Sequence, residues 1–278
     1  MDYKVLTTVV GLLFCLSQAL AKQLTVLHES NNIFGPMWVY EVDNVRCLSF
    51  LPPDNREDEQ TCIYYDNPQI VVYDYCKMIL GALYINTKPK RVLLIGLGGG
   101  TIATAIHKLV PTAEIDIVEI NQDMLYVARE FFFFNHAQNI HIHIEDGNDF
   151  IRKATPNSYD LVILDAFNKD YVPESFLTDE FVLNLKRCLT QQGIVAVNTY
   201  NDGLQKYDNV SKKEARLYNS IFSDLFELTS PPSKVILAMK NGRLPSIDRI
   251  KEAASNWSNS FNLIGIDSMW LADKFSRQ

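Results

Sequence analysis

The sequence predicts an α/β fold with a doubly wound, mainly parallel sheet, preceded by a small β-rich unit. Between residues 91 and 239, short apolar strands alternate with segments of helical periodicity. A glycine-rich turn at residues 96–100 follows the first of these strands, and acidic residues end the next ones. With 278 residues, 47% hydrophobic and 21% charged, the chain is long enough to bury a large globular core.

The N-terminal unit is expected over residues 22–86. Two strand-like segments, 37–42 and 45–50, flank Asp43 and Asn44, which is typical of a hairpin turn. Residues 61–65 predict a further short strand. Apolar residues at helical spacing then predict a helix over 71–84 that leads into the larger domain.

The larger domain is expected over residues 87–278. Residues 92–95 form a fully apolar strand, and apolar strands that alternate with helices predict a parallel sheet, which binds its ligand at the carboxyl ends of the strands. The expected strands are 92–95, 114–118, 140–144, 159–164, 193–198 and 235–239, and the expected helices are 101–109, 123–134, 149–154, 178–189 and 212–225.

The first twenty-one residues read as a separate segment. An apolar run from Val5 to Leu16, followed by Ala19-Leu20-Ala21, has the pattern of a signal peptide. The run is shorter than the ~20 residues of a spanning helix, although an anchor through residues 5–20 is an alternative, as is a buried or amphipathic helix. We therefore expect an exported, periplasmic or membrane-anchored protein, or a cytoplasmic one if the segment is not a signal.

The net charge weighs against a nucleic-acid-binding protein, and the cysteine spacing weighs against a fold built on a disulfide framework. A net charge of −7 is the wrong sign for a protein that binds a phosphate backbone, so no nucleic-acid partner is expected. The five cysteines form no C-x-x-C pair, and their spacing does not predict a disulfide framework.

The glycine-rich turn predicts a nucleotide or nucleoside site. Gly96, Gly98 and Gly100 allow a ligand to approach the backbone at the start of the next helix. Glu119 ends the second strand, where a carboxylate can accept both ribose hydroxyls. Thr101 stands where the dinucleotide fingerprint needs its third glycine, which weighs against NAD.

Two further strand ends carry acids. Asp146, followed by Gly147, is placed to bind an adenine amino group, and Asp165 ends the fourth strand. A helix cap or a solvated turn is the structural alternative for each acid. Taken together, the acids favour an adenosyl-sulfonium nucleoside over a dinucleotide.

Several segments resemble the spermidine synthase (polyamine aminopropyltransferase) family, whose members have the Rossmann-like fold of class I S-adenosylmethionine-dependent methyltransferases. They are VLLIGLGGGT, VEINQDMLYVARE, IEDGNDFI, YDLVILDAFN and VPESFLTDEF, with EQTCIYYDNPQ and YDYCKM upstream. The resemblance covers roughly residues 33–240. It implies that Glu119 binds the ribose and that Asp146 and Gly147 bind the adenine.

The resemblance also implies the catalytic and substrate residues. Asp165 would be the general base, and Tyr75 would contact the acceptor. Gln60, with Thr61, matches a Gln-Ser/Thr pair of the family, and Asn168 lies in the loop that closes over the substrate.

The sequence departs from the family pattern where charge matters most. Gly99 stands where the family has an Asp that contacts the donor's ammonium group, and Asn168 replaces the second Asp of the loop. Cys76, after Tyr75, replaces a Gln or His. A polycation needs several carboxylates to offset its desolvation, so we expect an acceptor other than ordinary putrescine.

Three functions remain open at this point. The first is transfer of an aminopropyl group from decarboxylated S-adenosylmethionine to a small-molecule amine, in polyamine biosynthesis. The second is a methyltransferase that uses S-adenosylmethionine, with Gly99 making room for the donor's carboxylate. The third is an inactive, exported nucleoside-binding or interaction protein. No permanently bound cofactor and no metal are expected. The sequence is compatible with a homodimer.

Two other motifs have mainly structural interpretations. His141 and His143 share a strand face, with His136 nearby, and could bind Zn²⁺, but sheet histidines usually form structural hydrogen bonds. The run of Phe at 131–134 predicts core at a helix end rather than a base-stacking surface.

Overall fold

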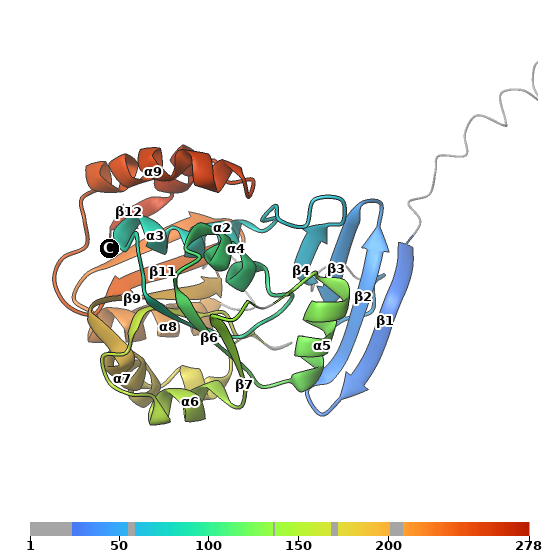
Figure 1. Cartoon of the computed structure of the whole chain (residues 1–278). Coiled ribbons are helices and arrows are strands. Elements are labelled where there is room, and N and C mark those ends of the chain that lie inside the picture. Colours follow the sequence, from blue (N-terminus) through green and yellow to red (C-terminus); the bar gives the residue numbers. More distant parts are fainter. Residues whose placement is uncertain (1–23, 55–58, 136, 168–171, 201–207, 278) are drawn as a thin grey trace, which may run out of the picture.

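The computed structural model describes residues 24–54, 59–135, 137–167, 172–200 and 208–277. The predicted signal or anchor segment, His136 and Asn168 lie outside the described residues. The described chain forms a four-stranded and an eight-stranded sheet with helices around the larger one (Figure 1). Among the described residues, no helix is both long enough and apolar enough to cross a membrane.

The small sheet is antiparallel, with its strands in sequence order. The expected hairpin is confirmed, because Val42 pairs with Val45 around Asp43, which has a φ of 56°. The strands are β1 (Leu24–Asn32), β2 (Gly35–Val42), β3 (Val45–Ser49) and β4 (Glu59–Tyr64).

A disulfide joins β3 and β4. Cys47 and Cys62 are direct partners in the antiparallel register and are bonded, with Cα atoms 4.1 Å apart. The cysteine spacing predicted no disulfide framework, and the described residues contain this one bridge. Spacing along the chain does not reveal a bridge that is made by cross-strand register. Cys76 and Cys188 are free and buried.

The large sheet has the strand order β12-β10-β11-β9-β8-β5-β6-β7. Strands β5 to β9 run parallel, whereas β10, β11 and β12 are antiparallel to their neighbours. This confirms the mainly parallel, Rossmann-like sheet preceded by a small antiparallel unit. The strands are β5 (Arg91–Ile95), β6 (Glu114–Glu119), β7 (Ile140–Ile144), β8 (Tyr159–Leu164), β9 (Leu189–Tyr200), β10 (Leu225–Ser230), β11 (Ser233–Met239) and β12 (Phe275–Arg277).

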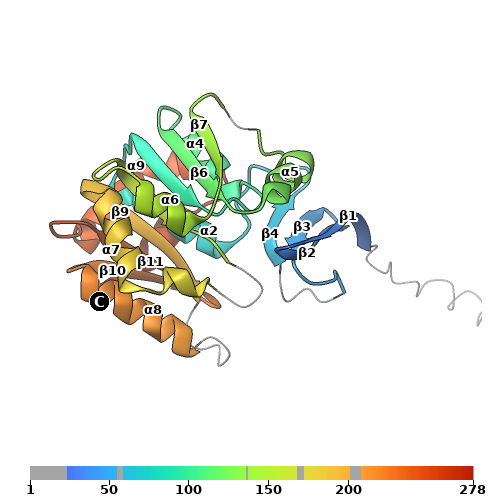
Figure 2. The same cartoon turned by 90° about the horizontal axis from the view of Figure 1, so that it is seen from below.

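Helices cover both faces of this sheet, as Figures 1 and 2 show. Val92 and Leu94 of β5 pack into one apolar cluster with α4 and α9, and Leu93 and Ile95 pack into a second with α6, α7 and α8. Alternate residues of one strand therefore face two separate cores. The helices are α2 (Asp74–Leu80), α3 (Ala82–Ile85), α4 (Thr101–Leu109), α5 (Gln122–Phe131), α6 (Gly147–Lys153), the 3₁₀ helix η2 (Glu174–Phe176), α7 (Asp179–Cys188), α8 (Asp208–Ile221), α9 (Ile247–Asn262) and α10 (Ser268–Ala272).

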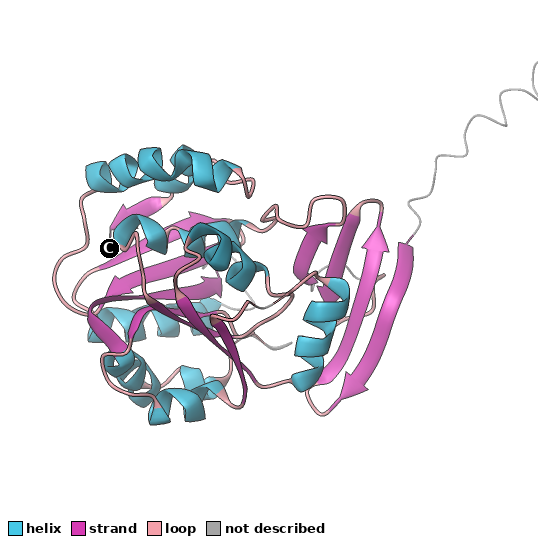
Figure 3. Cartoon of the chain, in the orientation of Figure 1, coloured by secondary structure: helices cyan, strands magenta, loops and turns pink. Residues whose placement is uncertain are grey.

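The small sheet packs against the larger domain beside α5, as Figure 3 shows. Met37, Val39 and Ile63 belong to the same apolar cluster as residues of α4 and α5. In addition, the Arg46 guanidinium donates to the backbone oxygen of Phe131 at 2.6 Å. These contacts hold β4 next to the glycine-rich turn.

Two local expectations need correction. The helix expected over 71–84 is two helices, α2 and α3, which meet at Gly81. A Cβ at Gly81 would lie 2.9 Å from the Met78 carbonyl oxygen and 3.1 Å from the Phe275 ring, so there is little room for a side chain there. The Phe run is only partly core, because Phe132 and Phe134 are buried while Phe133, with a φ of 57°, is half exposed.

Candidate active site

The glycine-rich turn lies where β5 and β8 end side by side. The Asp165 amide donates to the Ile95 carbonyl at 2.9 Å, so the ends of the two strands are in contact. A Cβ at Gly96, whose φ is +95°, would lie 2.2 Å from the Asp165 backbone oxygen. Gly100, at φ +80°, likewise faces the Phe134 ring, 2.5 Å from its Cβ position. Only glycine fits this close approach, and Gly98 is also left-handed, at φ +52°.

Glu119 faces this turn from the end of β6. It is 8% exposed, and its two carboxylate oxygens accept the backbone N–H groups of Leu97 at 2.9 Å and Asn121 at 2.8 Å. Burial raises the pKa of Glu119, and the backbone hydrogen bonds oppose that shift. The backbone N–H of Ile120 also acts on this carboxylate, and a carboxylate has about four acceptor positions, so it can still accept a ligand hydroxyl.

The hairpin between β1 and β2 reaches the same strand end. The Asn32 side chain donates to Asn121 at 3.3 Å and to Asp123 at 2.6 Å, at the start of α5. The sequence carries no local signal for this contact, because the partners are about ninety residues apart.

Asp146 and Gly147 have clear structural roles in the described chain. One oxygen of Asp146 accepts the N–H groups of Asn148 and Asp149 at 2.9 and 3.0 Å, which caps α6. A Cβ at Gly147 would lie 2.7 Å from a methyl group of Ile95. The cap uses only Oδ1, so a role of Asp146 in adenine binding stays a prediction.

Asp165 ends β8 on the other side of the turn. Asn198 of β9 donates its Nδ2 to Asp165 Oδ1 at 2.8 Å. Burial raises the pKa of the Asp165 carboxyl to about 6, although the hydrogen bond from Asn198 lowers it. A carboxyl with a pKa near neutrality is suited to proton transfer. Sequence reasoning identified Asp165 but missed Asn198.

Tyr75, whose pKa is influenced by the charge of Asp165, stacks on Tyr73. The rings of Tyr73 and Tyr75 are 5.8 Å apart at an interplanar angle of 20°. Tyr75 donates its hydroxyl to the Gln60 backbone oxygen at 3.3 Å. Burial, and then the charge of Asp165, raise the pKa of Tyr75 well above its ordinary value. The structure thus brings together Asp165, Tyr75 and the Gln60 backbone.

Glu59 adds a carboxylate that sequence reasoning missed. Its two oxygens accept the hydroxyl groups of Tyr40 at 2.6 Å and Tyr73 at 3.3 Å. Burial, followed by the charge and hydrogen bond of Glu59, raises the pKa of Tyr73. The contacts depend on tertiary packing, so no spacing in the sequence marks them.

Thr61 contacts the glycine-rich turn from β4. Its Oγ1 accepts the Gly99 N–H at 3.2 Å, and its Cγ2 lies 2.4 Å from the place a Cβ at Gly99 would take. The expectation that Gly99 makes room for a donor carboxylate stays a prediction, and any such room does not lie on the Cβ side of Gly99. The space beside Gly99 is filled by the Thr61 methyl group.

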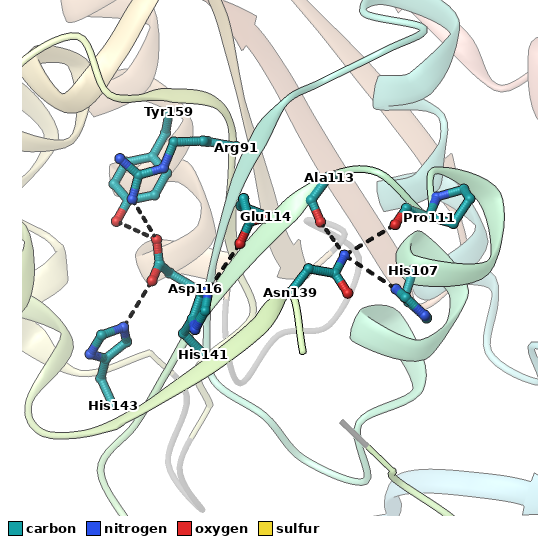
Figure 4. A network of polar contacts seen from close by, with 10 residues as sticks. All are labelled: Arg91, His107, Pro111, Ala113, Glu114, Asp116, Asn139, His141, His143 and Tyr159. Carbon is teal, nitrogen blue, oxygen red and sulfur yellow. Dashed lines mark hydrogen bonds and ion pairs between the residues drawn. The ribbon is translucent and has the colours of Figure 1, made fainter. Parts of the chain in front are cut away.

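His141 and His143 contact carboxylates of the neighbouring strand (Figure 4). Their Nε2 atoms lie 2.9 Å from Glu114 and from Asp116, respectively. Asp116 also accepts Arg91 at 2.9 Å and the Tyr159 hydroxyl at 3.0 Å. These histidines therefore belong to a polar network between strands.

One group of potential metal ligands lies close together in the described part of the chain. It consists of Cys47, Glu59 and Cys62. Because the two sulfur atoms are joined in the disulfide, only the carboxylate could serve as a ligand.

The fold is a Rossmann-like sheet, with acidic residues and a glycine-rich turn at the carboxyl ends of its parallel strands. A family model described as "Spermine/spermidine synthase domain" matches residues 74–229. A polyamine aminopropyltransferase of Vibrio vulnificus (strain CMCP6) is 32% identical over 251 residues, which are 88% of this chain and 82% of the relative. The chain belongs to the spermine/spermidine synthase family. The expected family and its transferase class are thereby confirmed.

Two solved structures show the same fold. A spermidine synthase in complex with the transition-state analogue AdoDATO has a TM-score of 0.70 at 19% identity, over 90% of this chain and 85% of that one. Human methyltransferase-like protein 13 in complex with SAH has a TM-score of 0.57 at 22% identity, over 68% and 89%.

Proposed function

We propose that this chain transfers an aminopropyl group from decarboxylated S-adenosylmethionine to an amine. The observation that carries the proposal is the Asp165 carboxyl, with a pKa raised to about 6, between the glycine-rich turn and Tyr75. Family membership and the aminopropyltransferase relative support the donor. The solved spermidine synthase with a transition-state analogue supports the same reaction class.

In this proposal the donor nucleoside lies across the carboxyl ends of β5 and β6. Glu119 accepts the ribose hydroxyls, and the free oxygen of Asp146 accepts the adenine amino group. The turn at Gly96, Gly98 and Gly100 lets the nucleoside approach the backbone. The sulfonium group then lies toward Asp165.

The chemistry is a nucleophilic substitution at carbon. The acceptor nitrogen attacks the aminopropyl carbon next to sulfur, the carbon–sulfur bond breaks, and methylthioadenosine leaves with the bonding electron pair. Asp165 accepts the proton that the acceptor nitrogen loses, and Tyr75 orients that nitrogen. A positioned base contributes roughly 10²- to 10⁴-fold, and alignment of the two reactants supplies most of the remaining acceleration.

The acceptor in this proposal is a small amine other than ordinary putrescine. Asn168 replaces the second Asp of the family's loop, so the chain offers one carboxylate fewer to a polycationic acceptor. Tyr75, which feels the charge of Asp165, stacks on Tyr73, and aromatic faces attract ammonium groups. We infer that binding of the acceptor depends on one strong contact, with the Asp165 carboxylate, and on packing against the aromatic rings.

We also propose that the protein is exported, or anchored to a membrane through residues 5–20. The Cys47–Cys62 disulfide supports this, because disulfides persist in oxidising compartments and are rare in the cytosol. N-terminal sequencing of the mature protein tests the proposal. A start near residue 22 supports cleavage, an intact start on a membrane-bound protein supports anchoring, and an intact start on a cytosolic protein contradicts both.

The function is tested by incubation with each of two donors and a panel of amines. We expect methylthioadenosine to accumulate only with decarboxylated S-adenosylmethionine, together with an aminopropylated amine. S-adenosylhomocysteine formed from S-adenosylmethionine would instead identify a methyltransferase. Binding of methylthioadenosine without turnover of either donor would identify an inactive nucleoside-binding protein.

A further inference from the structure

Strand β4 carries a β-bulge where it contacts the stacked tyrosines. Thr61 pairs with Leu48 of β3, whereas Glu59 pairs with Ser49. The register therefore passes over Gln60, which is the extra residue of the bulge. A bulge leaves its extra residue out of the ladder and re-aims a neighbouring side chain. The bulge at Gln60 thus sets the direction of Glu59, the residue just before it in the chain.

The bulge brings Glu59 to the face of β4 that carries the disulfide. Residues three apart in a regular strand point to opposite faces of the sheet. Glu59 and Cys62 are three apart, yet Glu59 Oε2 lies 3.6 Å from Cys62 Sγ. Without the extra residue, the Glu59 carboxylate would point away from this face, and it could not reach the Tyr73 hydroxyl, which lies 3.3 Å from it.

The backbone conformation explains why Tyr73 and Tyr75 can stack. Side chains two residues apart do not face each other on a helix, whereas in an extended chain they lie on the same side. Tyr73 is the extended residue before α2, with a φ of −80° and a ψ of 137°, and Tyr75 lies in the first turn of that helix. The two rings therefore meet on one side of the chain, with their centroids 5.8 Å apart.

The bulge holds both tyrosines at their hydroxyl groups. The Glu59 carboxylate accepts the Tyr73 hydroxyl at 3.3 Å, and the Gln60 backbone oxygen accepts the Tyr75 hydroxyl at 3.3 Å. The Tyr73 hydroxyl also lies 2.9 Å from Cys62 Sγ. Burial and the charge of Glu59 raise the pKa of Tyr73, so its hydroxyl stays protonated and remains a donor. Two consecutive residues of one strand thus fix the stacked pair.

We propose that Glu59 and Tyr73 are positioning residues that orient Tyr75 toward the acceptor amine. Glu59 holds the Tyr73 hydroxyl, and the Tyr73 ring limits the directions that the Tyr75 ring can take. Neither residue needs to touch the substrate, because both act through Tyr75. This inference rests on the proposed function, in which Tyr75 orients the acceptor nitrogen.

Steady-state kinetics with the best acceptor of the amine panel test the positioning role. Tyr73→Phe keeps the ring and removes the hydroxyl, and Glu59→Leu removes the oxygen atom that accepts it. Each variant should lower kcat/KM for the amine by about three- to tenfold, which is the effect of one hydrogen bond. Glu59→Gln should recover most of that loss, because its side-chain oxygen can still accept the Tyr73 hydroxyl.

Calorimetry with methylthioadenosine separates positioning of the amine from damage to the whole site. The affinity for this nucleoside should be the same in the wild type and in the variants of Glu59 and Tyr73, because the proposed nucleoside site is made of other residues. A loss of nucleoside affinity that equals the loss of kcat/KM would show a general distortion and would overturn the positioning role.

A double-variant cycle shows whether the effect passes through Tyr75. Tyr75→Phe removes the hydroxyl that is proposed to orient the acceptor nitrogen. In that background, Tyr73→Phe should change kcat/KM for the amine by less than about twofold, because no hydroxyl remains to be oriented. A loss of about three- to tenfold that persists in the Tyr75→Phe protein would overturn the positioning role.

Tyr84→Phe is the matched control for the loss of a buried hydroxyl. Tyr84 lies in α3, and its hydroxyl is 2.8 Å from Ser268 Oγ. This variant should melt at a lower temperature than the wild type and keep the wild-type kcat/KM. If Tyr73→Phe behaves in the same way, Tyr73 is only structural and the positioning role is overturned, while the proposed function stands. If the wild type turns over no amine, the proposed function fails, and the positioning role fails with it.

Discussion

Asp165 shows how the environment of one residue sets its chemistry. Burial raises its pKa to about 6, so the free enzyme holds this carboxyl protonated in mildly acidic solution. We expect kcat/KM to rise with pH through about 6, because only the carboxylate can accept a proton. The measurement is a pH profile of methylthioadenosine release at low substrate concentration.

The same pKa predicts the direction of a stability change. The raised pKa means that the folded state binds the proton more tightly than the unfolded chain, so this contribution to stability is present below the ordinary pKa of about 3.9 and is lost as pH rises through about 6. Asp165→Asn should remove that dependence from chemical unfolding curves. Wild-type and variant curves with the same pH dependence would contradict the assignment.

Glu119 and Asp146 are both expected to bind the nucleoside, but only Asp146 also caps a helix. Glu119→Ala and Asp146→Ala should each weaken methylthioadenosine binding by about 1–3 kcal/mol, because ligand donors lose their acceptor. Asp146→Ala should also destabilise the fold by about 1 kcal/mol through loss of the α6 cap. Calorimetry and thermal unfolding measure the two effects.

Asp146→Asn is the matched control for the cap. Asn caps a helix about as well as Asp, so this variant should keep its stability. Unchanged affinity for methylthioadenosine in both alanine variants would contradict the nucleoside site.

The sequence predicts site residues that end strands. Glu119 and Asp165 were found because parallel strands bring their carboxyl ends to one edge. Thr61, Glu59 and Asn198 were not identified with their contacts, because each depends on tertiary packing between distant segments. Residue type and spacing carry no signal for such contacts.

At the scale of elements, the absence of a side chain at Gly96 allows the carboxyl ends of β5 and β8 to lie in contact. Gly96→Ala should destabilise the fold by about 2–4 kcal/mol and abolish nucleoside binding, because its Cβ would lie 2.2 Å from the Asp165 carbonyl oxygen. Gly242→Ala is the matched control, with a φ of +93° and only a 3.6 Å contact to Met239. It should cost about 1 kcal/mol, from backbone strain alone.

Thermal unfolding and calorimetry on both alanine variants provide the measurement. If Gly96→Ala costs no more than Gly242→Ala, the contact with Asp165 does not explain the glycine at position 96.

The helices and strands, like the site residues, are predictable from the sequence only where the signal is local. The parallel strands β5, β6 and β8 were predicted within a residue or two, because nearly all of their residues are buried. β1, β10, β12, α9 and α10 were not predicted as elements. β10 and β12 mix polar with apolar residues, and β12 pairs with β10 from far along the chain.

At the scale of the whole molecule, the disulfide fastens the small sheet that carries Thr61 and Glu59. It closes a segment with a sequence separation of 15, which corresponds to about 3 kcal/mol of stabilisation. Reduction should therefore lower the melting temperature by roughly 6–10 °C. The double variant Cys47→Ala, Cys62→Ala should melt at the lower temperature with or without reductant.

Mass spectrometry of unreduced peptides provides the check on this bond. Cys47 and Cys62 should appear in one linked species, whereas buried Cys76 and Cys188 should react with a thiol reagent only after unfolding. Free thiols at all four positions, with a melting temperature indifferent to reductant, would contradict the bridge.

The most direct test of the whole account measures turnover, ligand affinity and stability on one variant, Asp165→Asn. The account predicts that release of methylthioadenosine from decarboxylated S-adenosylmethionine and an amine falls by about 10²- to 10⁴-fold. Affinity for methylthioadenosine and the melting temperature should change little, because Asn keeps the size of the side chain that contacts Asn198. A variant that turns over the donor at the wild-type rate would contradict the account.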